Sequence, residues 1–154
     1  AILASIVIGF FDGTIEQMVA LAILMPIVAS MGGNAATQTL TITVRALATR
    51  ELLAINTLRV IGREMGIGLL NGILFAVLLG LTGWFWFGSE MLGIVLAMAM
   101  IVNMFVAGLA GILVPIWLNK VGIDPAIASG VFVTTITDIV GFLAFLGFAT
   151  IFLI

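Results

Sequence analysis

Long apolar runs, separated by short polar connections, make up most of the chain. A helix needs about 20 residues to cross the roughly 30 Å hydrocarbon core of a bilayer. Four runs reach that length, at residues 15–34, 65–87, 91–118 and 126–154. A further run, residues 1–11, would reach about half way across at 1.5 Å per residue, and we interpret it as the second half of a truncated helix. The pattern predicts an all-α integral membrane bundle of five transmembrane helices, in one domain of residues 1–154.

The polar connections hold two further structural signals. Residues 39–44 alternate Thr with Leu, Ile and Val, which is the period of a strand. An open strand at membrane depth would leave its backbone groups unpaired, so we interpret these residues as a continuing helix. Asn56 is a candidate N-cap for the helix that follows.

Composition supports a membrane protein and narrows its chemistry. The chain is 64% hydrophobic and 8% charged, whereas a soluble domain has about a quarter of its residues charged. It contains neither Cys nor His, so disulfides, Ser-His catalysis and thiolate or imidazole metal sites are excluded within it. Any metal must meet oxygen ligands, which favour Mg²⁺, Ca²⁺ or Mn²⁺. Met98, Met100 and Met104 lie close together and could hold Cu(I), but Met is a common filler of apolar helices.

The charged residues predict an orientation. All five basic residues fall in alternate connections, at Arg45, Arg50, Arg59, Arg63 and Lys120. The other connections carry the acidic Asp12, Glu16 and Glu90 and no basic residue. The positive-inside rule therefore places the basic loops in the cytoplasm and the C-terminus outside, in what we expect to be a bacterial inner membrane. No basic patch suits nucleic acid.

Asp138 is the most informative residue, because it lies about 12 residues into the last run and hence near the bilayer centre. A lone carboxylate at that depth costs about 2.5–3.5 kcal/mol, so it should face protein, water or an ion. At 100° per residue, Gly130, Thr134 and Gly141 share a narrow arc of the helix with Asp138. This arc is typical of a cation path. The structural alternative is a buried Asp that is protonated or bound to a neighbouring hydroxyl.

A second polar cluster occupies residues 26–38. Gly32 and Gly33 would allow close approach to backbone carbonyls, and Asn34 and Gln38 add neutral oxygen ligands. The cluster is either a notch for helix packing or one wall of the same cation path.

Two glycine pairs predict close contacts between helices. Gly62 with Gly66, and Gly68 with Gly72, have the small-xxx-small spacing of packed transmembrane helices. The spacing does not say whether the partner helix belongs to the same chain.

Several separated motifs resemble one family. They are Gly-Gly-Asn-Ala-Ala-Thr-Gln (32–38), Arg-Ala-Leu-Ala-Thr-Arg-Glu (45–51), Arg-Glu-Met-Gly-Ile-Gly-Leu-Leu-Asn-Gly (63–72), Gly-Ile-Asp-Pro-Ala (122–126) and Thr-Asp-Ile-Val-Gly (137–141). In this order they resemble the membrane domain of the MgtE magnesium channels. The resemblance implies a homodimer of five-helix subunits with the ion path along the two-fold axis. It also implies a cytoplasmic Mg²⁺-sensing portion with CBS domains, absent from this chain.

The same resemblance implies roles for individual residues. Asp138 matches the pore aspartate, and Gly32, Gly33 and Thr134 match positions whose backbone oxygens face the hydration shell of the ion. Asp124 matches an acidic residue at the cytoplasmic mouth that can bind further Mg²⁺. The chain departs from the family pattern at positions 130 and 131, where Gly and Val replace Asn-Pro and an amide ligand is missing.

We therefore expect a Mg²⁺ channel domain that carries the ion into the cell. The nearest alternative is a channel or carrier for Mn²⁺ or Ca²⁺, since ligand type alone does not distinguish these ions. An intramembrane aspartyl protease would need two aspartates at membrane depth, whereas Asp12 and Asp124 lie at the ends of apolar runs. A membrane scaffold without transport would leave Asp138 without a role.

Overall fold

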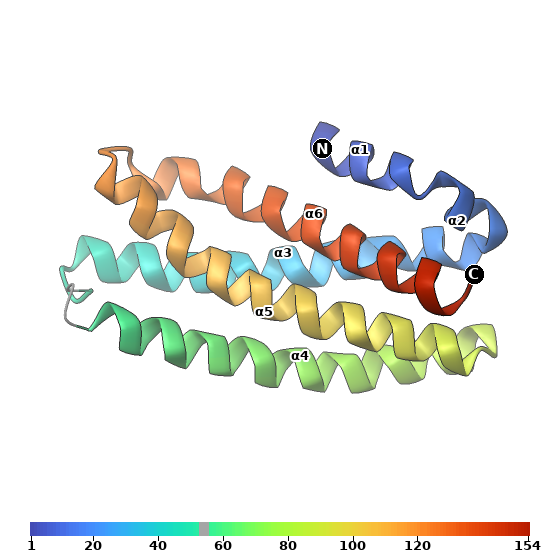
Figure 1. Cartoon of the computed structure of the whole chain (residues 1–154). Coiled ribbons are helices and arrows are strands. Elements are labelled where there is room, and N and C mark those ends of the chain that lie inside the picture. The colour runs from blue at the N-terminus through green and yellow to red at the C-terminus, as the bar shows by residue number, and fades with distance from the viewer. Residues whose placement is uncertain (53–55) are drawn as a thin grey trace.

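The computed structural model describes residues 1–52 and 56–154, and all regular structure in these ranges is helical. This confirms the all-α prediction. Figure 1 shows the helices running back and forth between the two ends of an elongated bundle. They are α1 (Ile2–Phe10), α2 (Asp12–Gln17), α3 (Val19–Ala48), α4 (Thr57–Phe87), α5 (Glu90–Lys120) and α6 (Pro125–Phe152).

Four of these helices, α3 to α6, are long and apolar enough to cross a membrane. They correspond to the four predicted runs, but the first begins differently. Met18 has an extended backbone (φ −143°, ψ 92°) and separates α2 from α3, so the run predicted from residue 15 is broken. A hydrogen bond of 2.8 Å between the hydroxyls of Thr14 and Thr150 ties α2 to the end of α6.

Helix ends extend beyond the apolar runs at the basic end of the bundle. α3 continues to Ala48, which confirms that residues 39–44 are helical, and its Thr41 hydroxyl donates to the Thr37 carbonyl at 2.9 Å. Asn56 is the N-cap residue of α4, as predicted, but its side chain makes no capping hydrogen bond. Its Nδ2 donates instead to the Glu51 carbonyl at 3.0 Å, which closes the connection before the helix begins.

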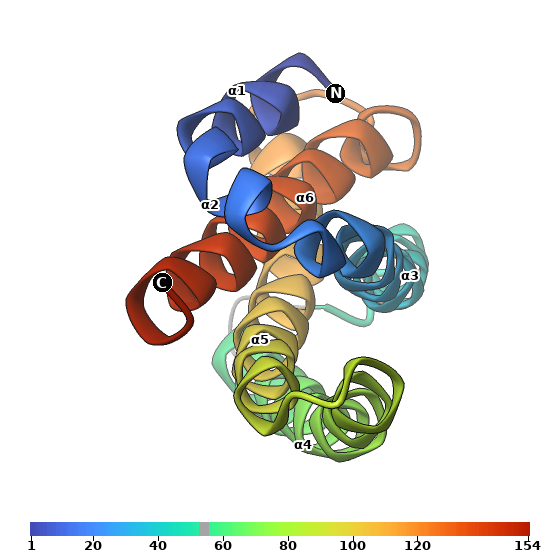
Figure 2. The same cartoon turned by 90° about the vertical axis from the view of Figure 1, so that its right-hand side faces the viewer.

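α5 is the central helix and packs against α3, α4 and α6, as the end-on view in Figure 2 shows. α4 contacts mainly α5, through a seam of small residues spaced by three or four. The buried residues of α4 are Gly68, Gly72, Ala76, Gly80 and Gly83. A Cβ atom at Gly72 would lie 3.2 Å from the Cα of Ile101 on α5, so the helices meet at backbone distance.

The two glycine pairs differ in whether they pack against another helix of the chain. Gly68 and Gly72 both lie in the seam, which confirms the packing prediction for that pair. Gly62 and Gly66 face outward, with no neighbouring atom within 4 Å of a Cβ built on either of them. Among the described residues, that pair has no helix to pack against.

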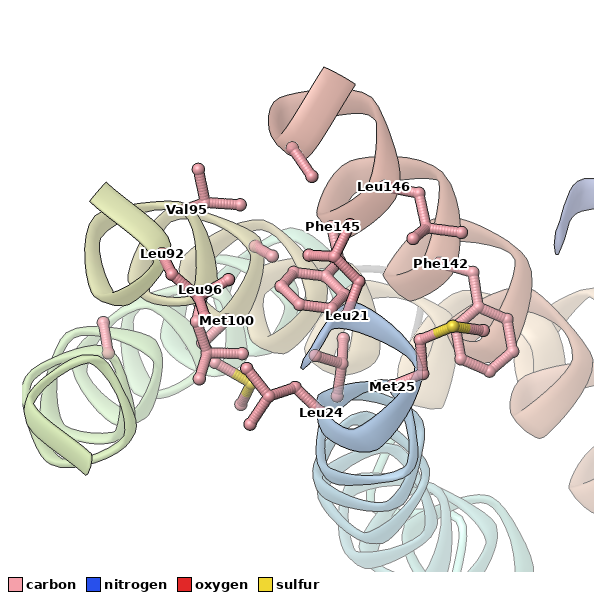
Figure 3. Packing of buried hydrophobic residues seen from close by; sticks show 14 of the residues in the cluster. Leu21, Leu24, Met25, Leu92, Val95, Leu96, Met100, Phe142, Phe145 and Leu146 are labelled. Atoms are coloured by element: carbon pink, nitrogen blue, oxygen red, sulfur yellow. The ribbon is translucent and has the colours of Figure 1, made fainter. Parts of the chain in front are cut away.

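The larger apolar cluster lies between α3, α5 and α6 in the half of the bundle near α2 and the C-terminus, and a smaller one joins the same helices in the other half. Figure 3 shows side chains from these three helices directed into the larger cluster, including Leu21 and Met25 from α3 and Phe145 from α6. Met100 and Met104 of α5 are at most 2% exposed and belong to the larger cluster, in agreement with their interpretation as apolar filler.

The connections alternate between the two ends as the charges predict. The α3–α4 and α5–α6 connections lie at one end in Figure 1, and α2, the α4–α5 connection and the C-terminus lie at the other. The basic residues therefore gather at the first end, while Asp12, Glu16 and Glu90 lie at the second.

Candidate functional site

α6 carries both candidate carboxylates, and its first turn explains the conformation of one of them. Asp124 is the N-cap, with Oδ1 accepting from the Ala126 backbone N–H at 2.9 Å, and Pro125 occupies the first helical position. Asp138 lies 14 positions further along, which is about 21 Å at 1.5 Å per residue. The two side chains of one chain are therefore too far apart to share an ion.

Asp138 lies on a partly exposed arc of α6 with Gly130 and Thr134. The hydroxyls around it bond to the helix backbone: Thr134 donates to the Gly130 carbonyl at 2.9 Å, and Thr137 donates to the Thr134 carbonyl at 3.0 Å. Within the described part of the chain, the Asp138 carboxylate has no hydrogen-bond or ion-pair partner. A carboxylate bound to a neighbouring hydroxyl is thus not what the structure contains.

The open arc of α6 ends at Asp138. Further along the helix, Phe142, Phe145 and Ala149 occupy nearly the same angular position and are buried in the core. In the first half of α6 the buried side is the opposite one, at Ser129 and Val133. α6 therefore crosses α3 and α5 obliquely, so that within residues 1–154 this arc is open towards the basic end and closed towards the other.

α3 contributes a polar stripe of exposed residues at helical spacing: Ser30, Asn34, Thr37 and Thr41. The Thr37 hydroxyl donates to the Gly33 carbonyl at 2.8 Å. Because the hydrogen points to the backbone, the lone pairs of this oxygen remain available on the outer side as acceptors. Such a stripe is unfavourable against lipid, so it requires water, an ion or another protein surface.

The predicted path residues fall into two groups. Gly33, Asn34, Gly130, Thr134 and Asp138 lie on open or partly open surface. The other group, Gly32 and Gly141, is buried against the side chain of Asn103 from α5. The glycines of this second group therefore make helix contacts within the chain.

The open residues of α3 and α6 lie at a similar depth along the bundle. Gly32 and Gly141 contact the same Asn103 amide and so lie at one level. α3 and α6 run in opposite directions (Figure 1), so Gly33 and Asp138 both lie on the basic side of that level. The offsets are one and three residues, or about 1.5 and 4.5 Å.

Gln38 lies on the side of the α3 polar stripe that faces α4. It lines a crevice of about 240 Å³ with Arg63, Glu64 and Asn71 of α4 and Gly108 of α5. Its proposed place on the cation path therefore lies at the edge of the polar stripe, towards α4.

Asn103 is the functional candidate that the sequence reasoning missed. It is fully buried at the middle of α5, and its Nδ2 donates to the Val28 carbonyl of α3 at 2.8 Å. A polar amide inside an apolar run was the available signal, because such residues usually bridge helices.

These features define a class: a polytopic α-helical membrane protein with an unpaired carboxylate on a polar surface at mid-depth, as in proteins that carry ions. Residues 25–148 match the MgtE family model, described as divalent cation transporter, and the chain belongs to this family. The family is thus one of transporters, not enzymes.

Two curated relatives support the assignment. The chain is 36% identical over 147 residues to the magnesium transporter MgtE of Bacillus subtilis, covering 96% of this chain and 33% of that protein. It is 36% identical over 143 residues to the magnesium transporter MgtE of Thermus thermophilus, covering 93% and 32%. The chain spans about a third of the length of these relatives.

Asp124 caps α6 and is also the predicted Mg²⁺ ligand at the cytoplasmic mouth, which leads to a first prediction. Asp124→Ala removes the cap and the charge, and should lower the free energy of unfolding by about 1 kcal/mol. Asp124→Ser keeps a capping oxygen and should be close to wild type in thermal unfolding in detergent. If Asp124 also binds a cation, both variants should lose the same part of the Mg²⁺-dependent stabilisation. A Ser variant that keeps all of it would restrict Asp124 to the cap.

Proposed function

We propose that this chain is the ion-conducting membrane domain of a Mg²⁺-selective channel, and that two copies form the path. The observation that carries the proposal is the unpartnered Asp138 carboxylate on an open polar arc at mid-depth. The family assignment supports transport of a divalent cation, and the names of the relatives support Mg²⁺.

The chemistry of Mg²⁺ favours a site shared by two copies. This ion prefers six oxygens in octahedral array and dehydrates reluctantly, so a path that holds it with its water needs charge more than a tight cage. Within the described residues no three acidic side chains gather into a metal site. A second Asp138 facing the first across a two-fold axis would supply a second charge, and carbonyl and hydroxyl oxygens of α3 would contact the hydration shell.

A homodimer would also explain the exposed polar stripe. Among the described residues the exposed Asn34 amide has no hydrogen-bond partner, so it is costly against hydrocarbon, and a copy of the same polar surface across a water-filled path would remove it from lipid. In this proposal α1, which packs along α6, belongs to a fifth spanning helix. We also propose a cytoplasmic regulatory portion outside this chain. The length of the curated relatives, about three times that of the chain, is consistent with such a portion.

Reconstitution in liposomes tests the function. The chain, with a Mg²⁺-sensitive dye inside the vesicles, should produce influx along the Mg²⁺ gradient that saturates with external Mg²⁺. Mn²⁺ and Ca²⁺ are tested as competing and as transported ions, since a channel for either is the alternative. Faster flux of Mn²⁺ or Ca²⁺ than of Mg²⁺ would show that the channel selects that ion instead. No divalent flux at all would favour a membrane scaffold that does not transport ions.

The orientation of the bundle is a second prediction. Glu90 and Asn119 are exposed residues at opposite ends of α5, and the chain has no Cys of its own. In intact cells, Glu90→Cys should react with an impermeant thiol reagent added outside, whereas Asn119→Cys should react after permeabilisation. The expectation rests on the basic residues near Asn119, which remain in the cytoplasm. The reverse labelling pattern would invert the assignment of entrance and exit.

A further inference from the structure

Asn103 places a polar amide at the centre of the bundle. Its side chain is 0% exposed, and it lies in the middle of the 31-residue helix α5, surrounded largely by apolar side chains. Its Nδ2 donates to the Val28 carbonyl at 2.8 Å, whereas its Oδ1 has no hydrogen-bond donor among the described residues. Burying an amide that makes one of its four possible hydrogen bonds costs free energy, so packing alone would favour an apolar residue at this position.

Glycines on two different helices make room for this amide. A Cβ atom on Gly32 of α3 would collide with the Asn103 Nδ2, and one on Gly141 of α6 would lie 2.8 Å from the same atom. Any other residue at either glycine would therefore displace Asn103 or separate the helices. Because Gly32 and Gly141 both lack a side chain, there is space between α3 and α6 for the Asn103 amide.

The contact points lie beside the open residues of the candidate path. Gly32 precedes Gly33, whose carbonyl is on the partly open side of α3, and Gly141 follows Asp138 by three residues. The hydrogen bond also ends on Val28, whose carbonyl in an α-helix is the acceptor for the Gly32 N–H. Asn103 thus holds the turn that presents Gly33 and contacts the turn that follows Asp138.

We propose that Asn103 is a positioning residue that sets the register between the Gly32–Gly33 segment of α3 and the Asp138 carboxylate on α6. The proposal rests on the proposed cation path at Asp138. In this proposal Asn103 does not contact the ion, but it fixes the relative positions of the groups that do. The predicted path residues lie on α3 and α6, but α5 would thereby control the affinity of the path for Mg²⁺ and its discrimination between ions.

The test uses two substitutions that differ in shape. Asn103→Leu keeps the branched outline of the side chain but cannot form the bond to Val28, and Asn103→Ala removes the amide altogether. In liposomes, each should raise the Mg²⁺ concentration for half-maximal flux by about 3- to 30-fold. Each should also lower the ratio of Mg²⁺ to Ca²⁺ flux. Met100→Leu, a volume-conserving change at a buried position of the same helix, should leave both quantities unchanged.

A purely structural Asn103 would give a different result. The variants would then yield less folded protein, but the folded fraction would keep the wild-type affinity and flux ratio, and the inference would be wrong. Where Asn103→Ala fails to fold, Asn103→Leu decides, because an apolar side chain is favourable at this depth. If the wild type carries no divalent cation, the proposed function fails instead.

A stability cycle tests the contact without any transport. Gly32→Ala should lower the unfolding temperature, and Gly32→Ala combined with Asn103→Ala should be more stable than Gly32→Ala alone, because the added methyl group then has room. Additive losses in this cycle would show that Gly32 and Asn103 do not share the space, and would overturn the positioning role even in a functional channel.

Discussion

Asp138→Asn is expected to abolish most Mg²⁺ binding while leaving a folded protein. The amide keeps the shape of the side chain and removes one negative charge per chain. Two unit charges 4 Å apart attract by about 4 kcal/mol at an effective dielectric constant of about 20, and a divalent ion gains about twice that from each carboxylate before desolvation. Mg²⁺ affinity, measured by calorimetry or by saturation of flux, should therefore fall by at least about 100-fold. Discrimination against Na⁺ and K⁺ should fall with it.

Glu90→Gln is the matched control, because it removes the same charge at an exposed position at the end of α5. It should change Mg²⁺ affinity by less than about 3-fold, since exposed charges are screened by salt. If Asp138→Asn kept wild-type affinity and selectivity and merely changed the thermal stability, Asp138 would be a structural residue and the cation path would have to lie elsewhere.

Gly93→Ala is expected to be the most destabilising small substitution in the α4–α5 seam. A Cβ atom at Gly93 would lie 2.5 Å from the Gly80 carbonyl oxygen and 3.1 Å from the Cβ of Trp84, so backbone would have to move. Such overpacking typically costs about 1–3 kcal/mol. The free energy of unfolding, followed by tryptophan fluorescence in mixed micelles with SDS, should fall accordingly.

The same substitution at Gly66 should act in the opposite direction. In the described part of the chain, nothing outside its own turn of helix lies within 4 Å of a Cβ built on Gly66, and Ala favours a helix over Gly by about 1 kcal/mol. Equal destabilisation by Gly66→Ala would mean that a helix outside this chain packs on that surface.

The membrane-spanning helices were predictable from hydropathy, because a segment that crosses the hydrocarbon layer must be apolar along its length. Runs of about 20 apolar residues identified α3 to α6, but they describe the hydrocarbon layer and not the helix itself. The apolar run alone ends at residue 34, and the helical interpretation of residues 39–44 came from the backbone requirement at membrane depth; the last turn of α3, to Ala48, was not predicted. The apolar runs also missed the break at Met18, because α2 is held by the Thr14–Thr150 hydrogen bond, a contact between residues 136 positions apart.

The candidate site was predictable as a set of residue types, and its division into open and buried residues was not. An angular arc on one helix placed Gly141 beside Asp138, but the oblique crossing of α6 buries the first and opens the second. Gly32 and Gly33 are adjacent in sequence and lie on different sides of α3. Gly32 is covered by Asn103, a residue of another helix far along the chain, and no local pattern contains that contact.

The central place of α5 has a consequence for how the chain assembles during synthesis. α3 and α4 emerge from the ribosome one after the other but have few contacts with each other, and both pack on α5. Until α5 enters the bilayer, the packing face of α3 and the glycine seam of α4 lack their main partner within the chain. The α4–α5 hairpin then closes through contacts that are local in sequence, the kind that form fastest. A nascent chain arrested before residue 90 should therefore remain a substrate for membrane quality-control proteases, and one that includes α5 should escape them.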